Sequence, residues 1–89
     1  MLYVNQFYII LWYIFYKGKN MKTAKRIGEN LKEARKFKGM TQKEVGALLH
    51  MTQQQYSRFE NGVFELNYDQ ILFLCQVYEI TPNELFSVE

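Results

Sequence analysis

The stretch that decides the fold is residues 40–62, MTQKEVGALLHMTQQQYSRFENG. Two helix starts of the same kind lie within it, because Thr41 and Thr52 are each followed three residues later by a Glu or a Gln. In such a capping box, the Thr hydroxyl and the later side chain bond backbone N–H groups that a helix start leaves free. Gly62 suits the end of the second helix. The stretch therefore predicts two short helices joined by a tight turn.

Each of these helices has a side that we expect to face inward, judged from spacings of three and four residues. In the first helix this side consists of Val45, Leu48 and Leu49. In the second helix it gathers two aromatic residues and an acid, Tyr56, Phe59 and Glu60. The two helices should therefore rest on a shared core.

The opposite side of the second helix carries only hydrogen-bonding side chains, which are Gln53, Gln54, Ser57, Arg58 and Asn61. Gln pairs well with adenine through N6 and N7, and Arg pairs well with guanine through O6 and N7. A polar helix face is often merely solvated, but this one coincides with two capping boxes, a short turn and an inward side. We therefore interpret it as a face that reads base edges in DNA.

Residues from about 27 to 86 resemble the phage-repressor-like helix-turn-helix family, the Cro and C1-type (XRE) regulators. Four separated signs carry the resemblance: Gln42 opening one helix, residues 52–54 (Thr-Gln-Gln) opening the next, Glu-Asn-Gly at residues 60–62, and Thr-Pro-Asn-Glu-Leu at residues 81–85. The resemblance implies an all-α, five-helix repressor-like domain. Such a domain binds a double-stranded DNA operator as a homodimer, with its third helix in the major groove.

The resemblance also implies roles for individual residues. Base contacts are expected from Thr52, Gln53, Gln54, Ser57 and Arg58, of which Ser57 could instead touch a phosphate. Phosphate contacts are expected from Gln42, Lys43 and Asn61, and the Gln42 amide could also brace the third helix. Arg35 matches the family position that pairs with Glu60, so a largely buried ion pair is expected.

Two residues depart from the family pattern. His50 stands where the turn usually carries Gly, and Gly46 stands where the helix before it usually carries Ala. His is among the better residues after Gly for a left-handed backbone, and no cluster of ligands near it in sequence indicates a metal or a general base. Gly46 keeps this position small where two helices cross, although Gly makes the helix about 1 kcal/mol less stable than Ala would.

Composition fits one small domain with an uneven distribution of charge. The chain has 89 residues and a net charge of +2. Residues 17–43 carry ten Lys or Arg and two Glu, whereas residues 44–89 carry one Arg and seven acids. The basic block can meet phosphates, although Lys32, Lys36 and Lys38 could equally form a solvated face. The single Cys75 is expected to be a buried reduced thiol in a cytoplasmic protein.

Three further helices are expected around the central pair. The first spans about residues 23–38 and ends at Gly39, with a stripe of Ala24, Ile27, Leu31 and Ala34. Another begins at Asn67 and buries Ile71, Leu74, Cys75 and Tyr78. The last opens at Thr81 with Pro82 at its first position, and places Leu85 and Phe86 in the core or a dimer seam.

Residues 1–20 form an apolar N-terminal extension that differs from the expected DNA-binding domain, residues 21–89. The run from Phe7 to Tyr16 is apolar and aromatic throughout. It lacks the marks of a signal peptide and is shorter than the roughly 20 residues that cross a bilayer. Three explanations stay open: an arm that pairs as a strand across a dimer or packs on the domain as a helix, upstream sequence translated from a start before Met21, and membrane attachment, against which the length argues.

Two functions of different class remain. One is a sequence-specific transcriptional regulator, expected to be a repressor. The other is a protein-interaction module, such as the antitoxin of a toxin–antitoxin pair. In that case the acidic half or the apolar tail would bind the toxin, and the helix-turn-helix would control the operon. No nucleophile and base pair, glycine-rich phosphate loop or metal-ligand spacing indicates an enzyme, a cofactor or a metal site.

Overall fold

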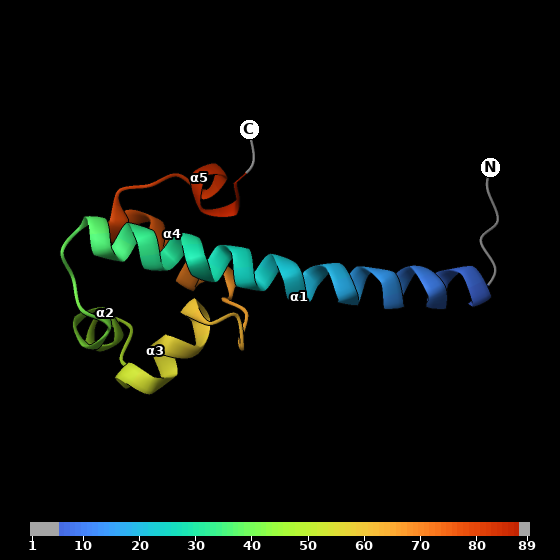
Figure 1. Ribbon diagram of the computed structural model, residues 1–89, viewed down its shortest axis with the longest axis horizontal. Helices are drawn as coiled ribbons and strands as arrows, with labels where there is room; N and C mark the ends of the chain where they lie inside the picture. Colours follow the sequence, from blue (N-terminus) through green and yellow to red (C-terminus); the bar gives the residue numbers. More distant parts are fainter. Residues whose placement is uncertain (1–5, 88–89) are drawn as a thin grey trace.

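The computed structural model describes the backbone of residues 6–87 and the side chains of residues 6, 8–15 and 22–87. Five helices make up this part of the chain: α1 (Gln6–Phe37), α2 (Gln42–Leu48), α3 (Gln53–Glu60), α4 (Tyr68–Tyr78) and α5 (Pro82–Phe86). No strand occurs within it, which confirms the all-α, five-helix prediction. The C-terminal half of α1 is the axis of the domain, with α2 and α3 on one side and α5 on the other (Figure 1).

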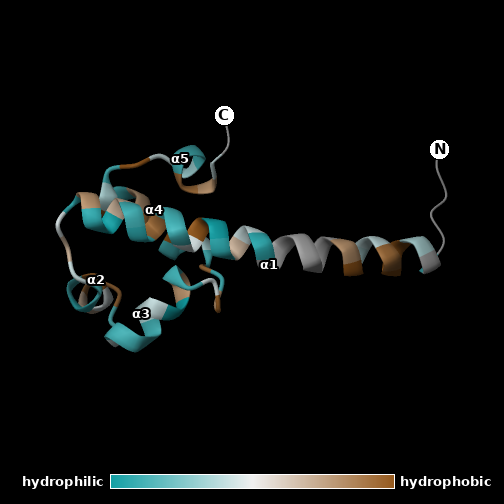
Figure 2. Cartoon of the chain, in the orientation of Figure 1, coloured by the Kyte–Doolittle hydropathy of each residue, from teal (hydrophilic) through white to brown (hydrophobic). Residues whose placement is uncertain are grey.

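Helix α1 is much longer than the sequence indicated, because it begins at Gln6 and not near Thr23. Its N-terminal half projects away from the other helices, and the longest dimension of the molecule is 50 Å (Figures 1 and 2). The expectations of a strand, or of a helix packed on the domain, are therefore wrong for the described part of the extension. α1 runs through the expected domain boundary between residues 20 and 21, and that boundary stays a prediction.

A local reason explains why the extension is helical. A helix satisfies its backbone hydrogen bonds within itself, whereas a strand needs a neighbouring strand, which no described segment of this chain offers. The sequence from Gln6 to Phe37 contains no Pro, which would break the helix. Gly18 lowers the stability of the helix by only about 1 kcal/mol relative to Ala. Among the helices described, none combines the length and the apolar character needed to span a membrane.

The helix ends follow the sequence closely. Helix α1 ends at Phe37, and Gly39 just after it has a left-handed backbone (φ 69°). The Met40 N–H bonds the Arg35 carbonyl at 3.1 Å, as in a Schellman motif. All four of the later helices begin with a complete capping box. In α3, for example, the Gln55 N–H donates to Thr52 Oγ1 at 3.1 Å, and the Thr52 N–H donates to Gln55 Oε1 at 2.8 Å.

The core lies where the five helices meet, and every helix contributes at least one buried side chain. Its buried members are Leu31, Val45, Tyr56, Phe59, Leu74, Cys75, Tyr78 and Leu85. The inward sides expected for α3 and α4 are confirmed, with Ile71 only partly buried. For α2 the expectation is wrong in part, because Leu48 is 46% exposed.

Gly46 explains the orientation of α2. It is buried, and a Cβ built on it would lie 3.0 Å from the Met51 carbonyl oxygen. The turn after α2 therefore folds back over Gly46, and Leu48 is left on the outer side. A small residue is therefore needed at position 46, as the sequence indicated.

Candidate nucleic-acid interface

A tight turn sets the angle at which α3 follows α2. Helix α2 ends at Leu48, α3 begins at Gln53, and His50 between them has the left-handed backbone expected for it (φ 57°). The Met51 N–H bonds back to the Gly46 carbonyl at 2.9 Å. The Thr52 cap then closes the start of α3. Together these contacts fix the first turn of α3 relative to α2.

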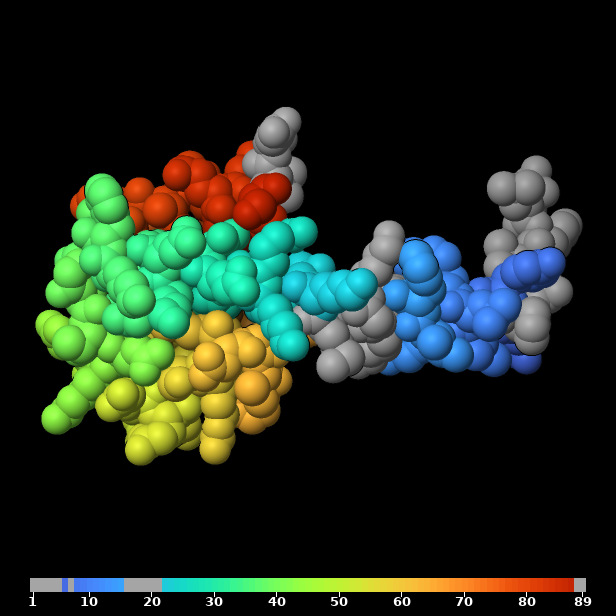
Figure 3. All heavy atoms as spheres, viewed as in Figure 1, coloured from blue at the N-terminus to red at the C-terminus, as the bar shows by residue number. Residues whose placement is uncertain are grey.

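The outward side of α3 carries the residues for which base contacts were expected. Thr52, Gln53, Gln54 and Arg58 are exposed, as is Asn61 at the helix end, and Ser57 is half-buried. In the space-filling view, the yellow atoms of α3 form the lower edge of the domain (Figure 3). The inward residues Tyr56, Phe59 and Glu60 are buried behind this edge. A continuous hydrogen-bonding surface therefore projects from the body of the domain.

Two side chains on this surface are held by neighbours. The Arg58 guanidinium lies 5.5 Å from the centroid of the Phe64 ring, which is a cation–π contact. The backbone supports it, because the Val63 N–H bonds the Arg58 carbonyl at 2.9 Å. The Asn61 amide donates to Ser57 Oγ at 3.1 Å. Phe64 was not among the residues expected to take part, because no local pattern in the sequence marks it.

A buried ion pair anchors α3 to α1. Arg35 donates from Nε to Glu60 Oε2 at 2.7 Å and from Nη2 to Glu60 Oε1 at 3.2 Å. The side chains are 11% and 1% exposed, respectively. A third donor of Arg35, Nη1, bonds the Met40 carbonyl at 2.9 Å and so reaches the loop that leads into α2. One guanidinium thus ties three segments together.

Gln42 extends this network towards the exposed surface. Its amide donates to Glu60 Oε1 at 3.0 Å, and its oxygen accepts from the Gln53 amide at 3.4 Å. Gln42 therefore braces α3, and it connects the buried carboxylate to the first residue of that helix. Lys43 beside it is exposed. A surface hollow of about 310 Å³ joins these residues at the starts of α2 and α3, whereas Asn61 lies at the far end of α3.

The electrostatics of Glu60 favour its charged form. Burial alone would raise its pKa, but hydrogen bonds from Arg35, Tyr56 and Gln42 outweigh burial and lower the pKa. Because an ionised carboxylate can only accept, the Tyr56 hydroxyl donates to it and accepts in turn from Tyr78, whose oxygen lies 2.5 Å away. Burial raises the pKa of Tyr78 to about 12, so this hydroxyl keeps its proton.

Gly28, which was not expected to matter, completes the contact between α1 and α3. A Cβ at this position would lie 2.3 Å from the Glu60 carbonyl oxygen and 2.7 Å from that of Phe59. The backbone of α3 therefore rests directly on α1 at this point. The only signal in the sequence is a Gly inside a helical pattern, which often marks a close approach.

The basic residues of α1 do not act as one block. Lys38 forms an exposed ion pair with Glu79, so it is engaged with the C-terminal part of the domain. Lys32 and Lys36 are exposed. Within the part of the chain that the structure describes, no group of His, Cys, Asp and Glu is arranged to hold a metal ion.

Comparison with known proteins agrees with this geometry. Residues 28–89 match the sequence profile of a family described as a helix-turn-helix domain. The antitoxin PezA of Streptococcus pneumoniae is 31% identical over 55 residues, which cover 62% of this chain and 35% of that protein. This chain therefore aligns with about a third of the length of its curated relative. No solved structure gives a significant match. The family profile covers more than half of the chain, which therefore belongs to the helix-turn-helix domain family, of the Cro/C1 type.

Proposed function

We propose that this protein is a sequence-specific regulator of transcription, and more narrowly a repressor, that inserts α3 into the major groove of an operator. The observation that carries the proposal is the outward side of α3. Its exposed residues are all hydrogen-bonding, and the helix behind them is fixed by a buried ion pair. A rigid helix that presents Gln and Arg to solvent is suited to reading base edges.

The roles of individual residues follow from their positions. Gln53, Gln54 and Arg58 are the proposed base readers, with Thr52 and Ser57 beside them at the same face. Phe64 restrains the Arg58 guanidinium, which lowers the entropy lost when that side chain meets a base.

The proposed phosphate contacts lie at the two ends of α3. Lys43 projects near the start of α3, and Asn61 lies at its end. Gln42 has one amide donor engaged by Glu60 and its oxygen engaged by Gln53, so its main role is to hold α3, with a phosphate contact as a second role.

Site selection from random duplex DNA tests the proposal. We expect enrichment of a palindromic site, because a homodimer places two copies of α3 on two half-sites. Binding to the selected site should exceed binding to scrambled DNA by at least about a thousandfold at one fixed salt concentration. Equal affinity for both would show that the protein is not sequence-specific.

A second function is favoured by one observation. The match to a protein named as an antitoxin supports an alternative in which this chain also binds a toxin and controls its own operon. The acidic residues that follow Lys43 would then face the protein partner, away from DNA. Co-expression with the product of a neighbouring small gene tests this alternative: rescue of growth supports it, and the absence of any toxic neighbour argues against it.

A further inference from the structure

The loop after α3 folds back onto the last turn of that helix. The Gly62 N–H bonds the Phe59 carbonyl at 3.2 Å, which closes the end of the helix. The N–H groups of Val63 and Phe64 then both bond the Arg58 carbonyl, at 2.9 Å and 3.3 Å. The loop therefore brings an aromatic side chain alongside residue 58, which lies on the outward side of α3.

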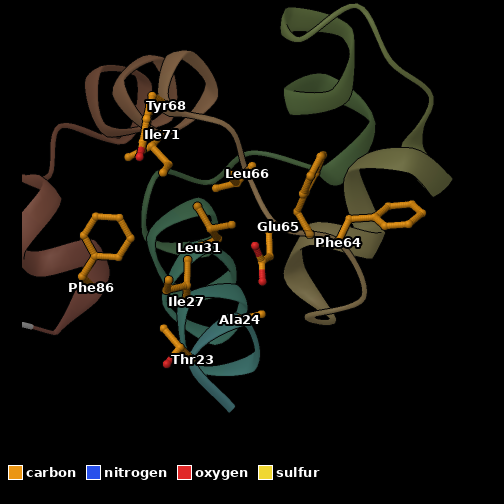
Figure 4. Close-up of a pocket in the computed structure, with 11 residues that line it drawn as sticks. Thr23, Ala24, Ile27, Leu31, Phe64, Glu65, Leu66, Tyr68, Ile71 and Phe86 are labelled. Carbon is orange, nitrogen blue, oxygen red and sulfur yellow. The ribbon is translucent and has the colours of Figure 1, made fainter. Parts of the chain in front are cut away.

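The Phe64 ring connects the core of the domain with the Arg58 side chain. It packs in a T-shaped arrangement against the buried Phe59, with the two ring centroids 6.5 Å apart. The Arg58 guanidinium lies 5.5 Å from the centroid of the same ring. Phe59 and Phe64 also line a cavity of about 280 Å³ that adjoins α1, and Phe64 and Phe86 lie at opposite ends of it (Figure 4). The ring is therefore held by the domain at one end of this cavity.

An apolar surface thus adjoins the hydrogen-bonding side of α3. Phe64 remains 50% exposed although it packs on the core, and Arg58 beside it is also exposed. In the major groove the base edges offer hydrogen-bonding groups and one apolar group, the C5 methyl of thymine. Phe is among the residues whose apolar contact recognises this methyl group. The chemistry of the exposed ring therefore matches a methyl group close to the base that Arg58 binds.

We propose that Arg58 and Phe64 read two adjacent base pairs as one unit. Arg58 binds a guanine, and Phe64 contacts the C5 methyl group of a pyrimidine in a neighbouring base pair. This assignment rests on the proposed function, because it specifies the chemistry that the same face of α3 recognises. Thymine and 5-methylcytosine carry the methyl group, whereas uracil and cytosine lack it. Phe64 is then a specificity-determining residue as well as a restraint on Arg58.

The distance between the two side chains fits adjacent base pairs. A guanidinium that bonds guanine O6 and N7 lies at the level of that base pair. Base pairs follow one another about every 3.4 Å along B-DNA. The Phe64 ring, centred 5.5 Å from the guanidinium carbon, can therefore reach the next base pair. Because the loop is bonded to the backbone of Arg58 itself, the ring stays close to that side chain when α3 enters the groove.

Replacing thymine by uracil tests the methyl contact, because this change removes only the methyl group and keeps every hydrogen bond of the base pair. The selected site should contain a thymine, on either strand, next to the guanine whose preference Arg58→Ala removes. Uracil at this place should weaken binding of the full chain about fourfold per half-site, which is the factor expected for burial of one group of this size. Uracil in place of a thymine outside both half-sites is the control and should change nothing.

A pair of variants tests whether Phe64 makes the contact. Phe64→Ala should bind the thymine and uracil forms of the site with equal affinity. Val63→Ala is the matched control: Val63 is the neighbouring exposed apolar residue, and the variant keeps the backbone N–H that bonds Arg58. It should distinguish the two forms as wild type does. The uracil experiment uses the wild-type chain, so it tests the contact independently of any effect of Phe64→Ala on folding.

A second pair of sites distinguishes the two bases that carry the methyl group. The thymine pair is replaced by a cytosine pair, with and without a methyl group on C5 of the cytosine. A gain of about fourfold per half-site on methylation shows that the ring reads the methyl group whichever base carries it. A methyl effect with thymine alone assigns the contact to thymine.

Three results would overturn the proposal while leaving sequence-specific binding intact. They are a selected site without thymine next to that guanine, equal binding of wild type to the thymine and uracil forms, and a Phe64→Ala chain that still distinguishes these forms. If Phe64→Ala loses the preference for guanine while wild type ignores the methyl group, Phe64 only holds Arg58 and the methyl contact is refuted. A chain that selects no DNA sequence at all would instead refute the proposed function.

Discussion

Removal of Arg35 should destabilise the protein strongly. The Glu60 side chain is 1% exposed and accepts two hydrogen bonds from Arg35, so Arg35→Ala leaves a buried carboxylate with only Gln42 and Tyr56 as donors. Breaking a buried pair by removing one partner costs about 3–5 kcal/mol. The total stability of a small domain is about 5–15 kcal/mol, so the variant should be close to unfolding at room temperature.

Urea denaturation followed by circular dichroism measures this cost. Glu60→Ala should lose a similar amount, and the double variant should lose less than the sum of the two, because neither charge is then stranded. Lys38→Ala breaks the exposed ion pair with Glu79 and serves as the control, with a far smaller effect. If Arg35→Ala unfolds at the same urea concentration as wild type, the ion pair does not hold α3 as we argue.

The pH dependence of stability gives a second signature of the same pair. The folded state lowers the pKa of Glu60, so its contribution is fully present above the unfolded value of about 4.3 and is lost as the pH falls through the folded pKa. Glu60→Gln should therefore reduce the loss of stability between neutral and acid pH. If this variant loses as much stability between neutral and acid pH as wild type does, Glu60 is not the group that titrates.

Three further predictions concern other parts of the molecule. Lys43→Ala should weaken binding to all DNA sequences alike and flatten the dependence of log Kd on log salt by about one unit, measured by titration at several salt concentrations. Gly28→Ala should lower the free energy of unfolding in urea by ~3 kcal/mol, because the new Cβ meets the backbone of α3. Gly39→Ala is the comparison: its Cβ would meet no neighbouring atom, and only the left-handed backbone at that position opposes the substitution. A chain that starts at Met21 should fold and keep its base preference, since the core and all the proposed DNA contacts lie after that residue; loss of half-site binding by this folded chain would contradict that separation.

Most of the fold could be predicted because its signals are local. Each capping box joins residues three positions apart, and the left-handed backbone of Gly39 follows from the residue type. The left-handed backbone of His50 was expected from the family resemblance, in which that position usually carries Gly. The inward side of α3 follows from helical periodicity. These features depend on short stretches of chain, so the sequence alone is enough to find them.

The missed features depend on contacts between distant segments. Gly28 is essential only because α3, some thirty residues later, lies against it, and Leu48 is exposed because the turn folds over Gly46. The restraint of Arg58 by Phe64 likewise depends on the path of the loop after α3. The start of α1 was misplaced because apolar, β-branched and aromatic residues permit both a strand and a helix, and only the available hydrogen-bond partners decide between them.

The central claim, that the outward side of α3 reads bases, is tested most directly by repeating the site selection with Arg58→Ala. The selected site of wild type should contain one position in each half-site at which the variant loses its preference. Affinity for that site should fall by about 1–3 kcal/mol while affinity for scrambled DNA stays the same. If the variant selects the same sequence as wild type, or loses equal affinity for both kinds of DNA, Arg58 does not read a base and the claim is contradicted.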